Sequence, residues 1–442
     1  MIKRTIELII TFIFLGLFIY IGRDKLAAYY YNRGVDFFDR GKYSQAIDEF
    51  ARSLKINPKR APTHYTLAAA FISNNAQDKA IQEYKKTIEL DPNYIPAYCA
   101  LVETYLNRDN YEEALGLLKK AQAKAPSNAK VQELGERAVF EYSAKCLSAG
   151  VDAFLTNDKV TAYELVKKGT EIKPDFAYAY YTLGSFYHAD NKLMPAEQAL
   201  EQAVSLDPKL WLAYKLLGDI YFEEKKYRNA VENYKKAVSI NSQDAGLQNN
   251  LGLALMEEEN YSEAIVYLKE ALRLDPQNVN LRYGLASVYR DKKDPQAAIR
   301  EYRKIIKVVP DYPNIHNDLG DIFAATGNDL EAEYEYQQEI EFDRRKLKND
   351  AQNPAILYAL SRAYFGLKDY EQAKESVENA LALDAQNRDY YLMLGQVEKK
   401  LGNYEASLEA LNKGKELSPG VKFIDKDIAD LKKNLKNSQE EK

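Results

Sequence analysis

The sequence has few of the residues that perform chemistry in proteins. Its 442 residues include two cysteines, three histidines and one tryptophan. Cys99 and Cys146 lie far apart and form no Cys-x-x-Cys pair, so the sequence predicts neither a zinc site nor a disulfide framework. The patterns GxxxxGK[ST], GxSxG and HExxH are all absent. We therefore expect a non-enzymatic protein with no catalytic residue, no metal and no cofactor.

The histidines and the net charge argue against a metal-binding and a nucleic-acid-binding protein. His64 and His316 each hold the fourth position of a repeated segment, where a packing role is expected, and no histidine pairs with another as a metal ligand. The net charge of −5 lacks the basic excess that nucleic-acid binding requires. We expect no nucleic acid and no small-molecule substrate.

Alanine instead recurs with a fixed period of 34 residues. Within each run the step is 34, and the two irregular steps are 48 and 41. The series is Ala46, Ala80, Ala114, then Ala162, Ala196, Ala230, Ala264, Ala298, Ala332, then Ala373. A period of this length is typical of a stacked array of small units.

The segment Ala177–Leu210 represents the repeated unit. Its apolar spacing predicts two amphipathic helices, Ala177–Ala189 and Pro195–Ser205. Gly184 in the first helix and Ala196 in the second are small, so the two axes can approach closely there. Such a hairpin has little core of its own and needs a neighbour on each side.

The spacing Tyr180-x2-Leu183-Gly184-x2-Tyr187…Ala196-x3-Leu200…Pro208 resembles the tetratricopeptide repeat (TPR) pattern, with Tyr in place of Trp. Eleven such units account for 374 of the 442 residues. They begin at Ala27, Ala61, Ile95, Ser143, Ala177, Trp211, Ala245, Val279, Pro313, Pro354 and Arg388. The resemblance implies an all-α, right-handed superhelical solenoid of hairpins that binds proteins.

Two insertions divide the array. Residues 27–128 hold units 1–3, residues 143–346 hold units 4–9, and residues 354–421 hold units 10–11. The insert 129–142 has helical spacing, and we expect it to lengthen the first helix of unit 4, where the long stretch Ala129–Leu155 has no proline. The insert 347–353 precedes Pro354, and either insert could be a joint or a tolerated loop. Residues 422–442 are expected to form a capping helix, Lys422–Asn437, with the apolar stripe Ile424, Ile428, Leu431 and Leu435, and a tail.

Residues 1–26 do not belong to the array. Residues 6–22 are almost free of charge and long enough for a short membrane span, which predicts a single N-terminal anchor. A cleaved signal peptide and a packing helix are the alternatives, but no small-x-small cleavage site follows at a suitable distance. Basic residues on the two sides are nearly balanced and slightly favour an extracytoplasmic array over a cytoplasmic one.

The resemblance also implies a concave groove lined by the first helices, at positions such as 5 and 9 of each unit. Tyrosines there offer contact area with a polar tip, and asparagine amides can hydrogen-bond an extended backbone. The predicted protein-binding residues are Tyr31, Tyr65, Tyr181, Asp219, Asn249, Asn250, Tyr283, Asn317, Asp321 and Tyr358. The alternative is that these side chains only cover the groove.

These features favour a membrane-tethered scaffold that binds protein or peptide segments in the groove. A second hypothesis is a regulatory or assembly subunit of a membrane-bound enzyme complex, in envelope polysaccharide or lipid synthesis or in secretion. A third is edge-to-edge self-assembly of the array.

Overall fold

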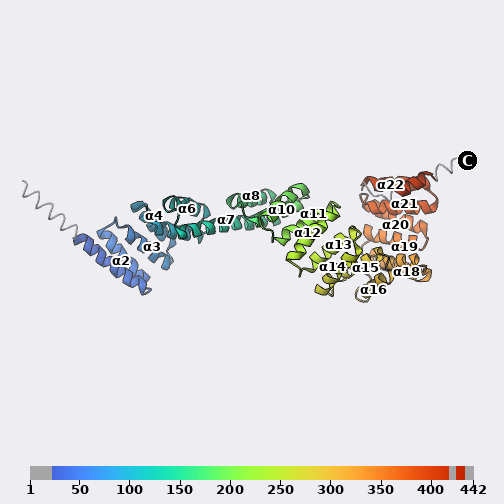
Figure 1. Ribbon diagram of the computed structural model, residues 1–442, viewed down its shortest axis with the longest axis horizontal. Coiled ribbons are helices and arrows are strands. Elements are labelled where there is room, and N and C mark those ends of the chain that lie inside the picture. The colour runs from blue at the N-terminus through green and yellow to red at the C-terminus, as the bar shows by residue number, and fades with distance from the viewer. Residues whose placement is uncertain (1–21, 418–424, 434–442) are drawn as a thin grey trace, which may run out of the picture. The chain divides into compact units, whose positions relative to one another are not determined.

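A computed structural model describes residues 22–417 and 425–433 of the chain, and every regular element in that part is a helix (Figure 1). The predicted anchor at residues 6–22 lies outside the described residues, apart from its last position. Within the described ranges, no helix combines the length and the apolar character that crossing a bilayer requires.

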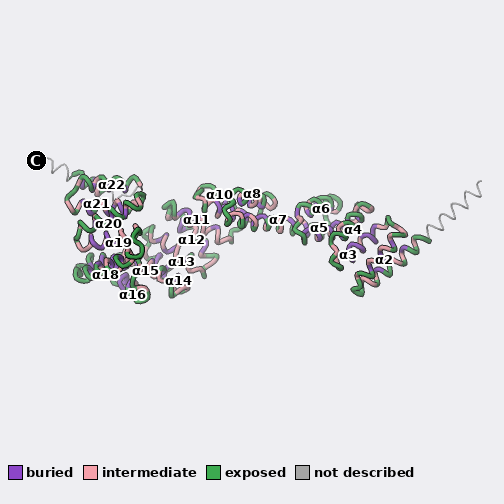
Figure 2. The backbone as a smooth tube through the Cα atoms, turned by 180° about the vertical axis from the view of Figure 1, so that it is seen from behind, coloured by how far each residue is buried: buried purple, intermediate pink, exposed green. Residues whose placement is uncertain are grey.

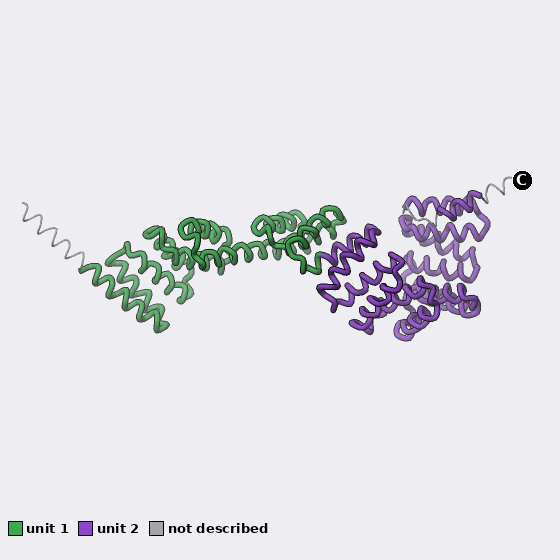
Figure 3. Tube along the Cα trace, in the orientation of Figure 1, with its two compact units in different colours: residues 1–213 green, residues 214–442 purple. Residues whose placement is uncertain are grey.

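The chain divides into two compact units, Met1–Ala213 and Tyr214–Lys442, which Figure 3 colours separately. The described part of unit 1 begins with a helix over residues 22–39. It continues with α2 (Tyr43–Ile56), α3 (Ala61–Ser73), α4 (Gln77–Leu90), α5 (Ile95–Leu106), α6 (Tyr111–Lys124), α7 (Ala129–Leu155), α8 (Lys159–Ile172), α9 (Ala177–Ala189) and α10 (Leu193–Leu206).

The boundary between the units falls within α11 (Trp211–Glu223). Unit 2 contains α12 (Tyr227–Ile240), α13 (Ala245–Glu257), α14 (Tyr261–Leu274), α15 (Val279–Asp291), α16 (Pro295–Ile306), α17 (Ile315–Ala325), α18 (Asp329–Leu347), α19 (Pro354–Gly366), α20 (Tyr370–Leu383), α21 (Arg388–Leu401) and α22 (Tyr404–Leu417). A further helical stretch covers residues 425–433.

Close contact at a small residue holds each hairpin together. At Gly184 of α9, an added Cβ would lie 2.7 Å from Leu200 Cγ and 3.3 Å from the Ala196 carbonyl oxygen of α10. The close approach predicted at Gly184 and Ala196 is therefore confirmed. The predicted α9 range is also confirmed, while α10 begins two residues earlier than expected, at Leu193.

Every hairpin turns at the same point, position 15 of its unit, where the backbone adopts a positive φ. Three of these residues are glycines, with φ between 71° and 84°, and the other eight have φ between 56° and 64°. They are Gly41, Asn75, Asp109, Asn157, Asn191, Lys225, Glu259, Lys293, Gly327, Lys368 and Gly402. This left-handed turn lets the second helix fold back on the first.

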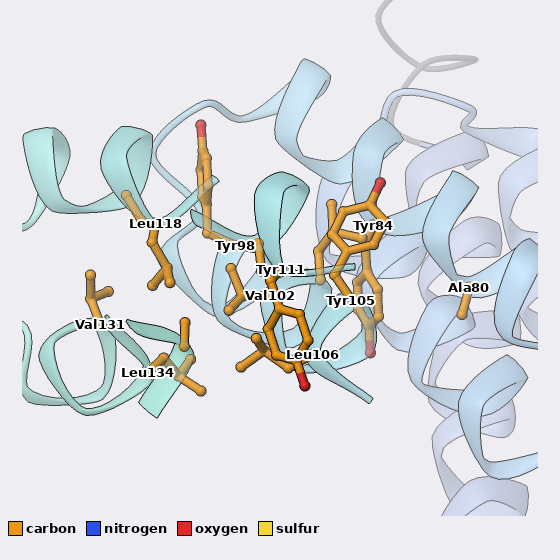
Figure 4. Packing of buried hydrophobic residues seen from close by; sticks show 14 of the residues in the cluster. Ala80, Tyr84, Tyr98, Val102, Tyr105, Leu106, Tyr111, Leu118, Val131 and Leu134 are labelled. Atoms are coloured by element: carbon orange, nitrogen blue, oxygen red, sulfur yellow. The ribbon is translucent and has the colours of Figure 1, made fainter. Parts of the chain in front are cut away.

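The core is a series of small clusters along the chain, so buried residues recur throughout the described part (Figure 2). Figure 4 shows one of them, where Tyr98, Leu118 and Leu134 come from three different helices of unit 1. At the other end, Ile428 and Leu431 pack against Leu392 and Leu411. The described part of the predicted capping helix therefore covers the last hairpin, while Ile424 and Leu435 lie outside the described residues.

The two inserts adopt different structures. The first forms the N-terminal half of α7, which runs over Ala129–Leu155 and confirms the predicted continuous helix. Of the second insert, only Leu347 is helical, as the last residue of α18, and residues 348–353 form the connection to α19. The helix α18 has 19 residues, whereas α20 in the next repeat has 14. The division into domains drawn from the sequence stays a prediction.

Candidate functional site

The predicted binding residues lie at positions 5 and 9 of the first helices, or next to them, and we call the surface formed by these positions the first-helix surface. In unit 1 its tyrosines pack through their rings. The Tyr31 ring lies 5.8 Å from the ring of Phe50, and the Arg60 guanidinium carbon lies 4.9 Å from the Tyr31 centroid. The Tyr65 ring lies 5.7 Å from that of Tyr84.

Tyr65 also packs on Tyr94, at 5.2 Å between ring centroids, and burial raises the pKa of its hydroxyl. Tyr181 of α9 is half-buried and lies 5.3 Å from Tyr178, ring to ring. These rings keep part of their surface exposed, so unit 1 offers aromatic contact area on its first helices.

In unit 2, Asp219 is the centre of a polar cluster. Its carboxylate lies 2.7 Å from Lys215 Nζ, and it accepts hydrogen bonds from the Tyr234 hydroxyl at 2.7 Å and from Asn250 Nδ2 at 3.2 Å. The structure therefore brings together two predicted residues, Asp219 and Asn250. The third, Asn249, lies against Gly284 of α15, where its Oδ1 would be 3.6 Å from an added Cβ.

A second polar cluster spans three successive first helices, α15, α17 and α19. Its centre is Asp318, whose side chain is only 2% exposed. The carboxylate accepts a hydrogen bond from the Tyr283 hydroxyl at 2.6 Å and contacts Arg290 Nη1 at 3.3 Å and Arg362 Nη2 at 3.2 Å. Burial, and then the neighbouring carboxylate, raises the pKa of Tyr283. The predicted free polar tip of Tyr283 is therefore used inside the protein.

Arg362 extends this cluster to Asp321, another predicted residue. Its Nη2 lies 2.7 Å from Asp321 Oδ2, and the Tyr336 hydroxyl donates to Asp321 Oδ1 at 2.8 Å. Tyr358 lies on α19 with its ring 5.1 Å from that of Tyr390, and burial raises its pKa. Asp318 and the two arginines are absent from the predicted binding residues, although Arg362 holds groove position 9 of its repeat.

The placement of Asn317 on an open surface was wrong. Asn317 is fully buried, and its Nδ2 donates to the Ala359 carbonyl of α19 at 2.9 Å. Its backbone N–H donates to Glu339 Oε2 at 3.2 Å. Asn317 therefore joins two first helices and has no surface for a partner.

A hollow of about 390 Å³ adjoins the Asp318 cluster. Arg290 and Asp321 belong to both, and the remaining lining residues come from the turn after α15, the start of α16 and the C-terminal end of α17. These are Lys293, Pro295, Ile322, Ala325 and Thr326. The hollow has an apolar lining between charged side chains, which suits one aliphatic or aromatic side chain of a bound segment.

The two buried histidines hold equivalent interhelix positions. His64 Nδ1 lies 2.5 Å from Glu83 and Nε2 lies 3.0 Å from the Pro58 carbonyl oxygen. His316 contacts Glu335 at 2.6 Å and the Pro310 carbonyl at 3.1 Å. Although burial lowers the pKa of each imidazole, the carboxylate and carbonyl contacts leave it raised. The packing role predicted for both is confirmed.

The described residues 22–417 and 425–433 contain no group of three or more His, Cys, Asp or Glu residues arranged to hold a metal ion. Cys99 and Cys146 are free thiols. The first-helix surface therefore presents shape, aromatic area and fixed charges, and these features suit recognition of another molecule.

All the protein-family models that match the chain describe the same repeat. Models described as tetratricopeptide repeat match residues 27–60, 75–138, 177–210, 255–317 and 358–421, and one described as TPR repeat matches residues 218–258. Together these ranges cover well over half of the 442 residues. None of the matching models describes an enzyme family. No curated protein sequence matches the chain.

Solved structures with a similar arrangement of helices share little sequence. Yeast Tom70 is 16% identical with a TM-score of 0.45, covering 94% of this chain and 97% of its own. A tetratricopeptide repeat protein from Parabacteroides merdae is 16% identical with a TM-score of 0.48, covering 58% and 99%. MamA is 23% identical with a TM-score of 0.36, covering 38% and 97%. Similarities at this level carry no argument about partners.

Proposed function

Because the chain belongs to the tetratricopeptide repeat family, whose members generally mediate protein–protein interactions, we propose that it is a non-enzymatic, membrane-tethered scaffold binding a protein segment on its first-helix surface. In this proposal the array coils into a right-handed superhelix, and the first-helix surface forms its concave groove. The segment 6–22 anchors it in the membrane.

The Asp318 cluster is the observation that carries the binding proposal. Tyr283, Asp318 and Arg362 connect three successive first helices through direct polar contacts. Such contacts hold the side chains in place before a partner arrives, which lowers the entropy cost of binding. The hollow beside the cluster supplies the apolar pocket in which a partner side chain can anchor.

Residues inside the cluster are poor test positions, because their replacement would also loosen the fold. Ala325 is better suited, since it lines the hollow and is exposed. Glu331 on the second helix α18 is exposed and does not line the hollow, so it provides a matched control.

The test introduces a photo-crosslinking amino acid at position 325 or 331 of the full-length chain in its native membrane. We expect one protein to crosslink from position 325 and not from 331, and Ala325→Trp to abolish its co-purification while Glu331→Trp does not. Equal crosslinking from both positions would reject the hollow as the site. If the captured protein is a membrane-bound enzyme, the chain acts as its regulatory or assembly subunit.

The membrane side of the array is part of the same proposal, with an extracytoplasmic array slightly favoured by the flanking basic residues. A reporter fused after Lys442 and assayed on each side of the membrane tests this orientation. A soluble, unanchored fusion would reject the tether.

A further inference from the structure

The N-terminal half of α7 has the features of a first helix of a repeat. The third repeat starts at Ile95, and Ala129 follows that residue by one period of 34 residues. Gln132, at position 4 from Ala129, donates through Nε2 to the Pro126 carbonyl at 3.0 Å. The position-4 side chain Gln248 makes the same bond to the Ser242 carbonyl at 2.9 Å.

This repeat has no second helix. At position 15, where each complete hairpin turns with a positive φ, the counterpart is Ser143, which lies inside α7. The chain continues without a turn into the first helix of the next unit. The segment 129–142 is therefore half of a hairpin.

The face that a second helix would cover is open. In α9 this face is formed by positions 4, 7, 8 and 11, and at Gly184 it meets Leu200 of the second helix. In α7 the same positions are Gln132, Gly135, Glu136 and Val139, and all four line a hollow of about 880 Å³. The opposite face, with Val131 and Leu134, packs on the third repeat, in the cluster that Figure 4 shows.

We propose that this hollow binds one amphipathic α-helix of a partner protein, in the place of the missing second helix. The site continues the helix-on-helix interface of the preceding hairpin, since Leu115 and Leu118 of α6 form a second wall. Lys173 and Asp175, in the connection between α8 and α9, complete the lining. A helix satisfies its own backbone hydrogen bonds, whereas an extended chain would leave N–H and C=O groups unpaired between two helices. The volume matches about two turns of a helix 10 Å in diameter.

Four charged side chains line the hollow, and Lys173 and Asp175 pair with each other at 2.7 Å. The other two, Glu136 and Lys119, define the chemistry of the partner helix. Glu136 occupies position 8, where most repeats have a small residue such as Gly184. Lys119 lies on α6 and lines the hollow from that side. Neither takes part in an ion pair within the described part of the chain. The partner helix therefore carries Lys or Arg where a second helix of this array has its large apolar residue, and aliphatic residues towards Val139 and Phe140. Phe140 is 49% exposed, and its ring lies 5.4 Å from the ring of Phe176. This inference uses none of the residues of the first-helix surface.

The probe is a peptide with the sequence of α10, Leu193–Leu206, carrying Leu200→Lys. Leu200 is the residue that meets position 8 in its own hairpin, so the lysine would face Glu136. The peptide is stapled on its exposed side because an isolated helix of this length is marginal in water. Fluorescence anisotropy with the full-length protein should show at least ten-fold tighter binding of this peptide than of the unmodified sequence. Glu136→Leu should reverse that preference.

A blocking variant and a matched control complete the test. An added Cβ at Gly135 or at Gly116 meets no atom within 4 Å, so both sites accept a larger side chain. Gly135→Leu, inside the hollow, should weaken peptide binding at least ten-fold, and Gly116→Leu, outside it, should leave binding unchanged. Absence of peptide binding, or equal loss in both variants, would overturn the proposal. Self-association that Gly135→Leu abolishes would also overturn it, because a second copy would then occupy the hollow.

Discussion

The two compact units are built from the same hairpin, but different contacts hold the side chains of their first-helix surfaces. In unit 1, Tyr31 and Tyr65 make ring contacts, and the cation above Tyr31 is Arg60. In unit 2, the buried Asp318 holds two arginines and a tyrosine hydroxyl. Ring contacts tolerate the loss of one partner, whereas a buried ion cluster does not, because the remaining charge is left without compensation.

The turns show a second difference. The left-handed turn residues of unit 1 are Gly41, Asn75, Asp109, Asn157 and Asn191, all types that accept positive φ. Unit 2 places Lys225, Glu259, Lys293 and Lys368 in the same conformation, along with two glycines. An ordinary L-residue costs about 1–2 kcal/mol in this region. Unit 2 therefore stores strain at turns where unit 1 does not.

The largest expected effect comes from removing a cation from each surface. Arg362→Met leaves Asp318 buried with only Arg290 and Tyr283, and should cost about 3 kcal/mol or more. Arg60→Met, which removes a cation–π contact in unit 1, should cost about 1 kcal/mol or less. Hydrogen exchange of amides in α17 and α3 measures the local opening free energy in each case. Equal losses at the two sites would erase the distinction between the surfaces.

The second effect is a dependence on pH that distinguishes the His316 region of unit 2 from the His64 region of unit 1. Behind His316, Glu339 and Asp343 are each 2% exposed, and Lys346 is the nearby cation. Burial, and then the Glu339 carboxylate, raises the pKa of Asp343, and burial raises that of Glu339. The folded state thus holds a proton more tightly than the unfolded chain, where the Asp pKa is 3.8.

Stability from these carboxyls is therefore complete below pH 3.8 and is lost as the pH rises towards the raised folded pKa. The raised pKa of each histidine acts in the same direction, with loss above pH 6.5. Amides of α17 and α18 should become less protected as the pH rises from 5 to 8, by up to about 1.4 kcal/mol per pH unit for each proton released. Asp343→Asn should flatten most of this slope, while α3 and α4 show only the weaker slope of His64. A slope unchanged by Asp343→Asn would contradict the assignment.

The smallest effect concerns the turns. Glu259→Asn should stabilise unit 2 by about 0.5–1 kcal/mol, because asparagine accepts the left-handed conformation more readily. The reciprocal change in unit 1, Asn191→Lys, should destabilise it by a similar amount. Chemical denaturation followed by circular dichroism measures both. Shifts of the same sign would show that side-chain contacts, rather than φ, dominate at these positions.

The sequence was sufficient to predict the hairpins, because their period, small residues and turns are local features. The lengthening of the helix by the first insert was predicted, since no proline interrupts Ala129–Leu155, the range that α7 covers. The burial of Asn317 could not be predicted from the period of the repeat. Position 5 is open only if successive first helices keep a constant spacing, whereas here Asn317 bonds directly to the Ala359 carbonyl beyond the second insert.

The Asp318 cluster was predicted only in part, through Tyr283 and Asp321, for a related reason. Arg290 and Arg362 hold different positions in their units, 12 and 9, so no repeated pattern connects them to Asp318. Their contacts arise only when three helices are stacked. Burial of Asp343 likewise depends on the extension of α18, which converts a position that lies in a loop at Asp207 into a helical one.

The uninterrupted α7 also sets the direction of the chain that follows it. Its 14-residue insert turns the helix through almost four full revolutions, about 40° short of four at 100° per residue. Lengthening or shortening this helix by a single residue would rotate α8 to α10 by about 100° about its axis. A loop would absorb such a change, but a continuous helix cannot. The number of residues in this segment therefore fixes the rotation of α8 to α10 about the axis of α7.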